Sequence, residues 1–235
     1  MSVTVRFEAK HAFVLRPPQV QKLWATLERY IGHAKAVALC TDGVERNFTE
    51  INDLLSYENS RARAISELTL TAISANRESR GSISFGGRYS TTISGSALGP
   101  EESVISCRQA LEDTIDGCRP WFSPIVRFDL IDVVWVGFMF SFLVLSLMAG
   151  ESKKSQPMSL DKALFSALIV VGVLAVIALV VFGLHRLQRR YFPYKTFALG
   201  EGESRFAVDE NIRWVVIVGF VVSIFSSLVF GFLWS

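Results

Sequence analysis

The sequence contains few of the residues that build metal sites and disulfide frameworks. Among 235 residues there are three cysteines and three histidines. Disulfide-stabilised secreted domains carry more cysteines, usually an even number. Cys40, Cys107 and Cys118 are therefore predicted to be small buried thiols in a reducing compartment. No histidine has a second ligand at the spacing of a zinc site, so the sequence predicts neither a metal nor a cofactor.

Motifs that mark catalysis are also missing. There is no nucleophile elbow, no phosphate-binding P-loop and no HExxH helix. The segment Gly200-Glu-Gly202-Glu begins like a dinucleotide-binding fingerprint, but it lacks the third glycine and follows no crossover unit. We therefore predict that the protein is not an enzyme. The alternative is an enzyme with a cytosolic site of unrecognised type.

Charge of one sign is not in excess. The formal net charge is +2, and residues 1–127 hold 15 Lys and Arg against 14 Asp and Glu. A nucleic-acid-binding domain usually presents a basic patch, so no nucleic acid partner is expected. The sequence does not open on a basic segment followed by a long apolar run, and a signal peptide is not predicted.

Residues 1–118 have the pattern of an α+β domain. Alternating apolar residues predict strands at 2–15, 36–40, 44–48, 64–75, 82–85 and 89–94. Helical spacing of apolar residues predicts helices at 18–31, 50–57 and 101–115. No βαβ repeat is visible, so the order predicts one mostly antiparallel sheet with helices on one face.

Residues 119–129 form a connector after this domain. Two prolines and three large apolar residues make it stiff, unlike a Gly/Ser-rich tether. We expect Trp121 and Phe122 either to lie at the level of lipid headgroups or to pack beneath the domain.

Three apolar stretches predict a bundle of transmembrane helices in the domain 130–235, with spans at about 130–149, 163–184 and 214–234. The last contains 21 residues and no charge. At about 1.5 Å per residue a helix of that length covers roughly 30 Å, the thickness of a bilayer core. Trp214 and Trp234 at its ends match the two membrane–water interfaces.

The distribution of lysine and arginine predicts the orientation of this bundle. The loop after the first span has three such residues, whereas the connector and the loop 185–213 together have eight. The anchors on that side are Arg127, Arg186, Arg189, Arg190 and Arg213. The N-terminal domain and the loop 185–213 are therefore predicted to be cytoplasmic in a multi-pass inner-membrane protein, with the C-terminus outside. The loop is expected to add to the domain or to pack beneath it.

Small residues recur along the predicted spans. The third span places Gly219, Ser223, Ser227 and Gly231 on one face at a spacing of four. The other two spans contribute Ala163, Ala167, Ala175, Gly137 and Ser141. Because small residues let helices approach closely in lipid, this pattern predicts a packing seam. Packing within one chain and self-association or pore lining remain alternative interpretations.

Five arginines lie near the ends of the predicted strands: Arg61, Arg63, Arg77, Arg80 and Arg88. Guanidinium groups recognise carboxylates and phosphates, so these residues are candidates for contact with an anion or a partner. Glu67 and Glu78 are interleaved with them, and a solvated sheet edge is the alternative.

Together these patterns predict a non-enzymatic integral membrane protein. Its cytoplasmic domain would sense or dock a partner or ligand, and its helices would self-associate, as a channel or as a membrane-disrupting effector. The alternative is a membrane-anchored adaptor or scaffold subunit without conduction. The predicted partners are the lipid bilayer, further copies of the chain and a protein on the cytoplasmic side.

Overall fold

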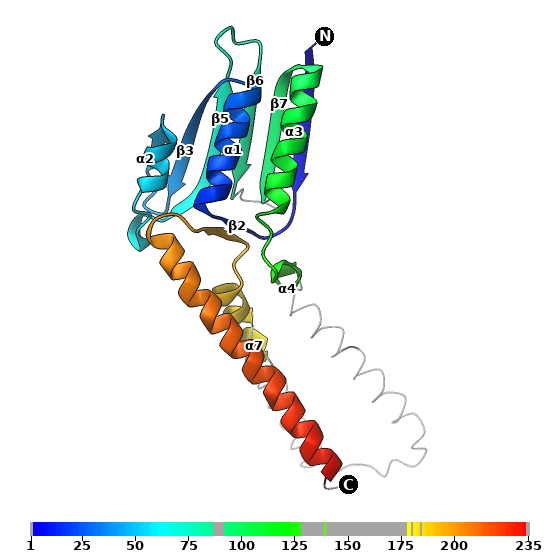
Figure 1. The fold of residues 1–235 in the computed structure, drawn as a ribbon. Helices are drawn as coiled ribbons and strands as arrows, with labels where there is room; N and C mark the ends of the chain where they lie inside the picture. The colour runs from blue at the N-terminus through cyan, green and yellow to red at the C-terminus, as the bar shows by residue number, and fades with distance from the viewer. Residues whose placement is uncertain are drawn as a thin grey trace, which may run out of the picture. The chain divides into compact units, whose positions relative to one another are not determined.

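The computed structural model in Figure 1 describes residues 2–86, 92–127, 139, 178–179, 181–183 and 185–233. The chain divides into two compact units, one formed by residues 1–123 with 193–235 and the other by residues 124–192. In the second unit, the Gln188 side chain donates a hydrogen bond to the Ile125 carbonyl at 2.9 Å. Ile125 belongs to the short helix α4 (Ser123–Arg127), which begins at the boundary of the units.

A six-stranded sheet forms the centre of the first unit. Its spatial order is β1 (Ser2–Ala9), β7 (Ile93–Pro100), β6 (Arg80–Phe85), β5 (Ile65–Ile73), β3 (His33–Cys40) and β4 (Glu45–Phe48). Every neighbouring pair is antiparallel. The α+β character and the antiparallel sheet are as predicted.

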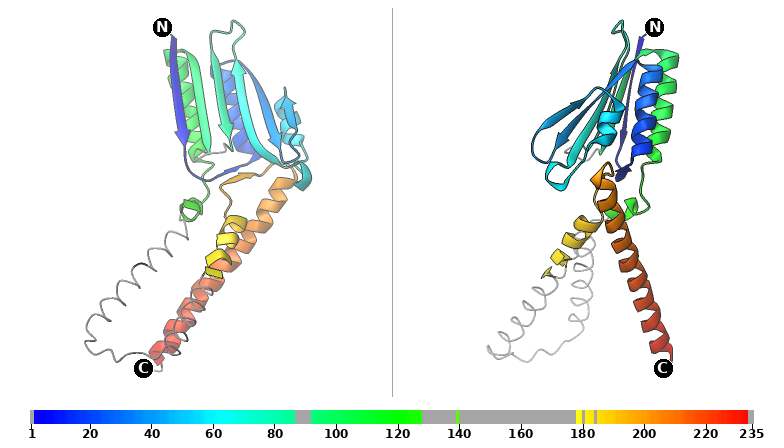
Figure 2. Two further views of the ribbon diagram at one scale, coloured as in Figure 1. Left: turned by 180° about the vertical axis from the view of Figure 1, so that it is seen from behind. Right: turned by 60° about the vertical axis from the view of Figure 1, so that its left-hand side comes forward.

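Two helices, α1 (Pro17–Tyr30) and α3 (Glu101–Asp116), lie side by side on one face of this sheet in both Figures 1 and 2. Along β5, Leu68, Leu70 and Ala72 point toward that face and are at most 1% exposed. The residues between them point to the opposite face, as the period of two along a strand requires. The core therefore lies between the sheet and these two helices.

Shorter elements close the far edge of the sheet. After β4 the chain forms α2 (Ile51–Ser56) and a 3₁₀ turn, η1 (Arg61–Arg63), before it enters β5. Leu54 of α2 is fully buried. The helices that cover the sheet are thus close to their predicted positions, because their apolar spacing is local and periodic.

The first predicted strand is two elements. β1 ends at Ala9, and a separate strand β2 (Phe13–Leu15) pairs in parallel with β8 (Lys195–Phe197). The Thr92 hydroxyl donates to the carbonyls of Ala9 and His11 at 3.1 and 2.6 Å and so fixes the turn between them. Through β8, part of the predicted loop 185–213 joins the N-terminal domain.

β7 lies later in the chain than the strand predicted at 89–94. Residues 87–91 are outside the described residues, and the strand runs from Ile93 to Pro100 between β1 and β6. A Cβ atom at Gly95 would come within 2.1 Å of the Phe7 ring, so this glycine makes room for a buried aromatic side chain. Glycines and serines have low strand propensity, so the local sequence gives little indication of a strand here. The position of β7 is determined by its pairing with β1 on one side and with β6 on the other.

Asn59 fastens the start of the long helix α7 (Glu201–Leu233) to the domain. Its side-chain nitrogen donates to the carbonyls of Phe197 and Leu199 at 3.0 and 2.9 Å, and its oxygen accepts from the Ile65 amide at 2.8 Å. Gly202 allows the close approach, because a Cβ there would lie 2.6 Å from the Asn59 nitrogen. The Gly200-Glu-Gly202 segment, which lies in the predicted loop 185–213, therefore leads into a helix.

The prediction of a three-helix transmembrane bundle is contradicted. Among the residues that the structure describes, no helix is both long and apolar enough to cross a membrane. This finding overturns the predicted integral membrane protein, with its multi-pass inner-membrane location, channel or effector activity and membrane-anchored adaptor alternative. The spans predicted at 130–149 and 163–184 fall outside the described residues, apart from 139, 178–179 and 181–183.

The helix that contains the third predicted span also begins earlier than expected. α7 starts at Glu201, and its first turns carry charged residues that contact the N-terminal domain. Arg213, expected at a membrane interface, is only 1% exposed. The predicted span covers only the 21 uncharged residues from Trp214 to Trp234. It therefore leaves out the polar turns of α7 that precede Trp214 and that include Arg213.

Candidate functional site

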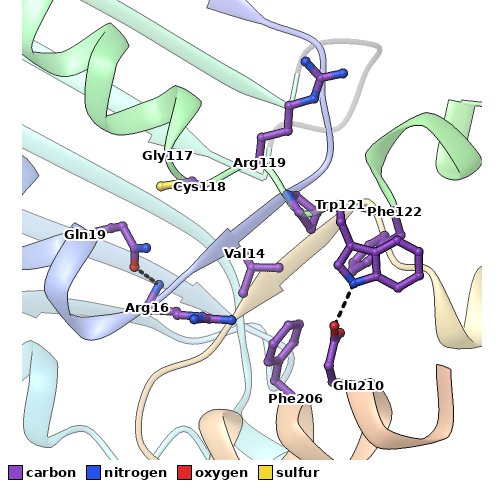
Figure 3. Close-up of a pocket in the computed structure, with 11 residues that line it drawn as sticks. Val14, Arg16, Gln19, Gly117, Cys118, Arg119, Trp121, Phe122, Phe206 and Glu210 are labelled. Carbon is purple, nitrogen blue, oxygen red and sulfur yellow. Dashed lines mark hydrogen bonds between the residues drawn. The ribbon is translucent and has the colours of Figure 1, made fainter. Parts of the chain in front are cut away.

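A cavity of about 270 Å³ lies where the start of α1, the segment after α3 and the first turns of α7 meet. We call it the α1–α7 cavity (Figure 3). Its walls include Val14, Arg16, Gln19, Trp121, Phe206 and Glu210. All of these belong to the first unit. The cavity therefore combines residues from both ends of the sequence.

The spacing along α7 brings three functional side chains to one side of the helix. Phe206, Glu210 and Arg213 are separated by four and three residues, which places them on neighbouring turns of one face. Phe206 and Glu210 line the cavity. Arg213 lies one turn further and contacts both the Phe206 ring and Glu210.

Arg213 is a buried cation that contacts several of these residues. Its guanidinium forms an ion pair with Glu210 and lies 4.4 Å from the centroid of the Phe122 ring and 5.2 Å from that of Phe206. An unpaired buried charge is costly, whereas ion pairing and aromatic faces offset its desolvation. Arg213 therefore ties α7 to the segment after α3.

Glu210 is held from two directions. One carboxylate oxygen accepts a hydrogen bond from the Trp121 indole nitrogen at 2.7 Å, drawn in Figure 3, and the other accepts from Arg213. Trp121 in turn packs against Trp214, with 5.6 Å between ring centroids. Because both oxygens are engaged, Glu210 organises the cavity wall.

Arg16 supplies the positive charge that faces the cavity. It precedes α1, and its backbone amide donates to the Gln19 side chain at 3.0 Å, which positions the first turn. Its guanidinium lies 5.4 Å from the centroid of the Phe206 ring. Figure 3 shows the Arg16 side chain directed toward Phe206, whereas the side chain of Arg119 extends away from Glu210.

The arrangement suits a ligand with one anionic group and one flat ring. Arg16 makes no ion pair with any carboxylate in the described part of the chain, and arginine binds carboxylate or phosphate through paired donors. Phe206 and Trp121 offer ring faces and edges for offset or edge-to-face packing. A volume of about 270 Å³ lies near the lower limit of ligand pockets, so the cavity has room only for a small molecule.

The structure does not gather the five predicted arginines into one site. Arg61 and Arg63 precede β5, whereas Arg77 and Arg80 follow its other end. Nine residues of strand separate the pairs by roughly 27 Å. All four are exposed, and Arg88 lies outside the described residues.

The predicted seam is described only in α7. Gly219, Ser223 and Ser227 are exposed, and a Cβ at Gly219 would meet no atom within 4 Å in the described residues. The Ser223 hydroxyl donates to the Gly219 carbonyl at 2.8 Å. Gly231 is helical. The positions predicted in the other spans fall outside the described residues: Ala163, Ala167, Ala175, Gly137 and Ser141.

The predicted anchors separate into two groups. Trp121, Arg213 and Trp214 meet around Glu210 at the α1–α7 cavity. The others lie in the second unit, with Arg186, Arg189 and Arg190 exposed and the Arg127 side chain not described, or outside the described residues, as Trp234 does. Self-association and a protein partner stay predictions.

The three cysteines are buried and free. Burial raises the pKa of Cys107 to about 11 and that of Cys118 to about 12, so both thiols are protonated at neutral pH. Within the described residues, no group of three or more His, Cys, Asp or Glu is placed to hold a metal ion. The absence of a cofactor remains a prediction.

Another polar cluster stands at the β3–β4 turn. Arg46 donates to both carboxylate oxygens of Asp42, at 3.1 and 2.7 Å, and this pairing lowers the pKa of Asp42 to about 2. Burial raises the pKa of Tyr57, whose hydroxyl donates to the Arg63 carbonyl at 2.8 Å. These bonds stabilise the turn.

The sequence did not point to Arg16, Asn59, Phe206 or Glu210. Their partners lie far away in the chain, and only the Phe206, Glu210 and Arg213 spacing is visible locally. A comparison of the chain with models of protein families, with curated proteins and with solved structures finds no match.

Proposed function

We propose that this chain is a non-catalytic ligand-binding protein. Its α1–α7 cavity takes a small anionic ligand that carries a flat apolar ring, such as an aromatic carboxylate. The ligand bridges α1 and α7 and thereby fixes the start of α7 on the N-terminal domain. The observation that carries this proposal is the Arg16 guanidinium in the cavity wall, which lies over the Phe206 ring at 5.4 Å from its centre and forms no ion pair in the described part of the chain.

The chemistry of recognition follows from these two side chains. The anionic group replaces water at Arg16 and forms charge-assisted hydrogen bonds, each stronger than a neutral one. The ring enters between Phe206 and Trp121, where burying apolar surface contributes about 25 cal/mol per Å². Since Arg16 belongs to the start of α1 and Phe206 to α7, the two halves of the ligand hold two elements together.

The contacts of Glu210 support a binding role over a catalytic one. It is the carboxylate that lines the cavity, and its two oxygens accept from Trp121 and Arg213. A general base needs an oxygen within reach of a substrate proton. Glu210 instead orients Trp121 and neutralises Arg213.

A panel of small ligands tests the proposal. The thermal unfolding midpoint of the full chain is measured with benzoate, indole-3-acetate and phenyl phosphate, and with the uncharged amides of the two acids. Binding to the folded state raises the midpoint, so we expect an anionic aromatic compound to do so and its amide to have a smaller effect. Arg16→Ala should weaken binding by about 10- to 100-fold, the loss of one charge-assisted contact of about 1.5–3 kcal/mol.

Arg29→Ala is the matched control for this experiment. Arg29 belongs to the same helix α1, and its guanidinium also lies 5.4 Å from an aromatic centroid, that of Tyr30, but it does not line the cavity. Its replacement should leave ligand binding unchanged. If no anionic aromatic compound binds, or if Arg16→Ala binds as tightly as the wild type, the proposal is wrong.

A further inference from the structure

The sheet presents a second face whose chemistry differs from that of the α1–α7 cavity. α1 and α3 lie on one side of the sheet, and the right-hand view in Figure 2 shows no helix from the described part of the chain on the other side. Along β6 the buried residues Gly81, Ile83 and Phe85 alternate with Ser82 and Ser84, which are partly exposed. The helix-free face is therefore rich in hydroxyl groups.

Strand register places three hydroxyls in a row with a cation at each end. Thr71 on β5 is opposite Ser82 on β6, which is opposite Ser96 on β7. Lys35 on β3 pairs with Thr71, and Arg6 on β1 pairs with Ser96. The row thus reads Lys, Thr, Ser, Ser, Arg across five strands.

A third cation lies beside the middle of this row. Arg80 occupies the next position on the same face of β6, two residues before Ser82, between Ile73 and Leu98. A concavity of about 350 Å³ on this face is lined by Arg80, Ser82, Ser96 and neighbouring residues. We call this surface, with Lys35 and Arg6 at its ends, the basic sheet face.

The cations of the basic sheet face are not neutralised by carboxylates in the described part of the chain. Lys35, Arg6 and Arg80 are exposed, and none of them forms an ion pair there. The carboxylates closest in sequence are Glu8, two residues after Arg6 on the same face of β1, and Glu78, two residues before Arg80. Glu78 accepts a hydrogen bond of 2.6 Å from the Asn76 side chain in the turn.

We infer that the basic sheet face binds a small ligand that carries two or more linked phosphate groups. Strands about 4.8 Å apart and a rise of about 3.4 Å per residue put the Cα of Arg80 about 12 Å from those of Lys35 and Arg6. Long side chains from these positions reach a ligand above the hydroxyl row. The Ser82 and Ser96 hydroxyls are 2.9 Å apart, and since one donates to the other, the second has its proton for the ligand.

The size of the face favours a small ligand over a nucleic acid. Nucleic acids bind through six or more phosphate contacts over an extended basic surface. The basic sheet face instead has three cations, and one of them, Arg80, lines the concavity of about 350 Å³. Ile73, 49% exposed, and Leu98 provide an apolar border beside Arg80.

The test is calorimetric titration of the full chain with tripolyphosphate, inorganic phosphate and a 20-nucleotide single strand at 50 and 200 mM salt. We expect tripolyphosphate to bind at least tenfold more tightly than inorganic phosphate, and more weakly at the higher salt concentration. Arg80→Ala should lose about tenfold in affinity, and the pair Arg6→Ala with Arg80→Ala should lose more.

Two control variants separate this site from the others. Arg61→Ala removes an exposed arginine from η1, away from the basic sheet face, and should bind tripolyphosphate like the wild type. Arg16→Ala should also bind it normally, so this result is independent of the proposed function of the α1–α7 cavity. Absence of tripolyphosphate binding, an unchanged affinity in Arg80→Ala, or tighter binding of the single strand would each overturn the inference.

Discussion

Arg213 offers the strongest test of how α7 is held on the domain. It is 1% exposed, forms an ion pair with Glu210, and contacts the Phe122 and Phe206 rings. Replacing it by alanine leaves the Glu210 carboxylate without its cation and opens a cavity between the rings. Breaking a buried ion pair by removing one partner costs about 3–5 kcal/mol. Since the Glu210 side chain is 24% exposed and water can solvate it in part, we expect the lower value, about 3 kcal/mol.

The assay is urea denaturation of the full chain followed by circular dichroism, with amide hydrogen exchange of residues 202–213 as a local measure. Exchange is needed because α7 can open locally without unfolding the sheet. Arg213→Ala should accelerate exchange in these residues by roughly 100-fold, which is about 3 kcal/mol converted at 1.4 kcal/mol per tenfold change. Arg29→Ala, an exposed arginine on α1 with one aromatic contact, should change it less than threefold.

A double variant separates the charge from the packing. Arg213→Met with Glu210→Gln removes both charges and keeps most of the side-chain volume. Replacement of a buried pair by neutral residues is often tolerated, so this variant should be within about 1 kcal/mol of the wild type. If Arg213→Ala leaves exchange unchanged, Arg213 does not hold α7 and the explanation of the cavity wall is wrong.

Three further predictions concern the rest of the first unit. Asn59→Ala removes the hydrogen bonds to three backbone groups and should cost about 3 kcal/mol in urea, at about 1 kcal/mol each; an effect below 1 kcal/mol would contradict this. The pKa of Asp42 is lowered to about 2, so its stabilisation is present above about pH 4 and lost as the pH falls through 2; the thermal midpoint of Asp42→Asn should approach that of the wild type over this range. Cys107 and Cys118 have raised pKa values of about 11 and 12, so both should react slowly with a thiol reagent at pH 8 until the chain is unfolded, and stability should fall as the pH rises above about 9.

The periodic spacing of apolar residues predicted several of the strands and helices of the N-terminal domain. The strands predicted from apolar alternation lie close to the observed β3 and β5. The helices predicted from helical spacing lie close to the observed α1 and α3. Each of these segments buries one face against the same core, so the spacing of its apolar residues indicates whether it is a strand or a helix. The boundaries moved by a few residues because end positions depend on turns and caps.

Contacts between residues far apart in the sequence could not be predicted from local apolar spacing. β2 and β8 pair across about 180 residues of sequence, and Asn59 binds carbonyls 138 and 140 residues away. The predicted membrane span rested on the length and apolar character of the stretch and on the tryptophans at its ends, and it treated Arg213 as an anchor. The helix instead begins at Glu201 and buries that arginine. Charged residues in the first turns of α7 had no visible partner in the sequence, so the cavity they help to form was not predicted.

Hydrogen exchange in the presence of a ligand tests the central claim most directly. The full chain is compared with and without a saturating concentration of the anionic aromatic compound that gives the largest thermal shift. If the ligand bridges Arg16 and Phe206, amides in residues 16–20 and 202–213 should exchange more slowly, and those in β5 and β6 should not change beyond the effect on global stability. Protection confined to other segments, or none in 202–213, would contradict a cavity that joins α1 and α7 through its ligand.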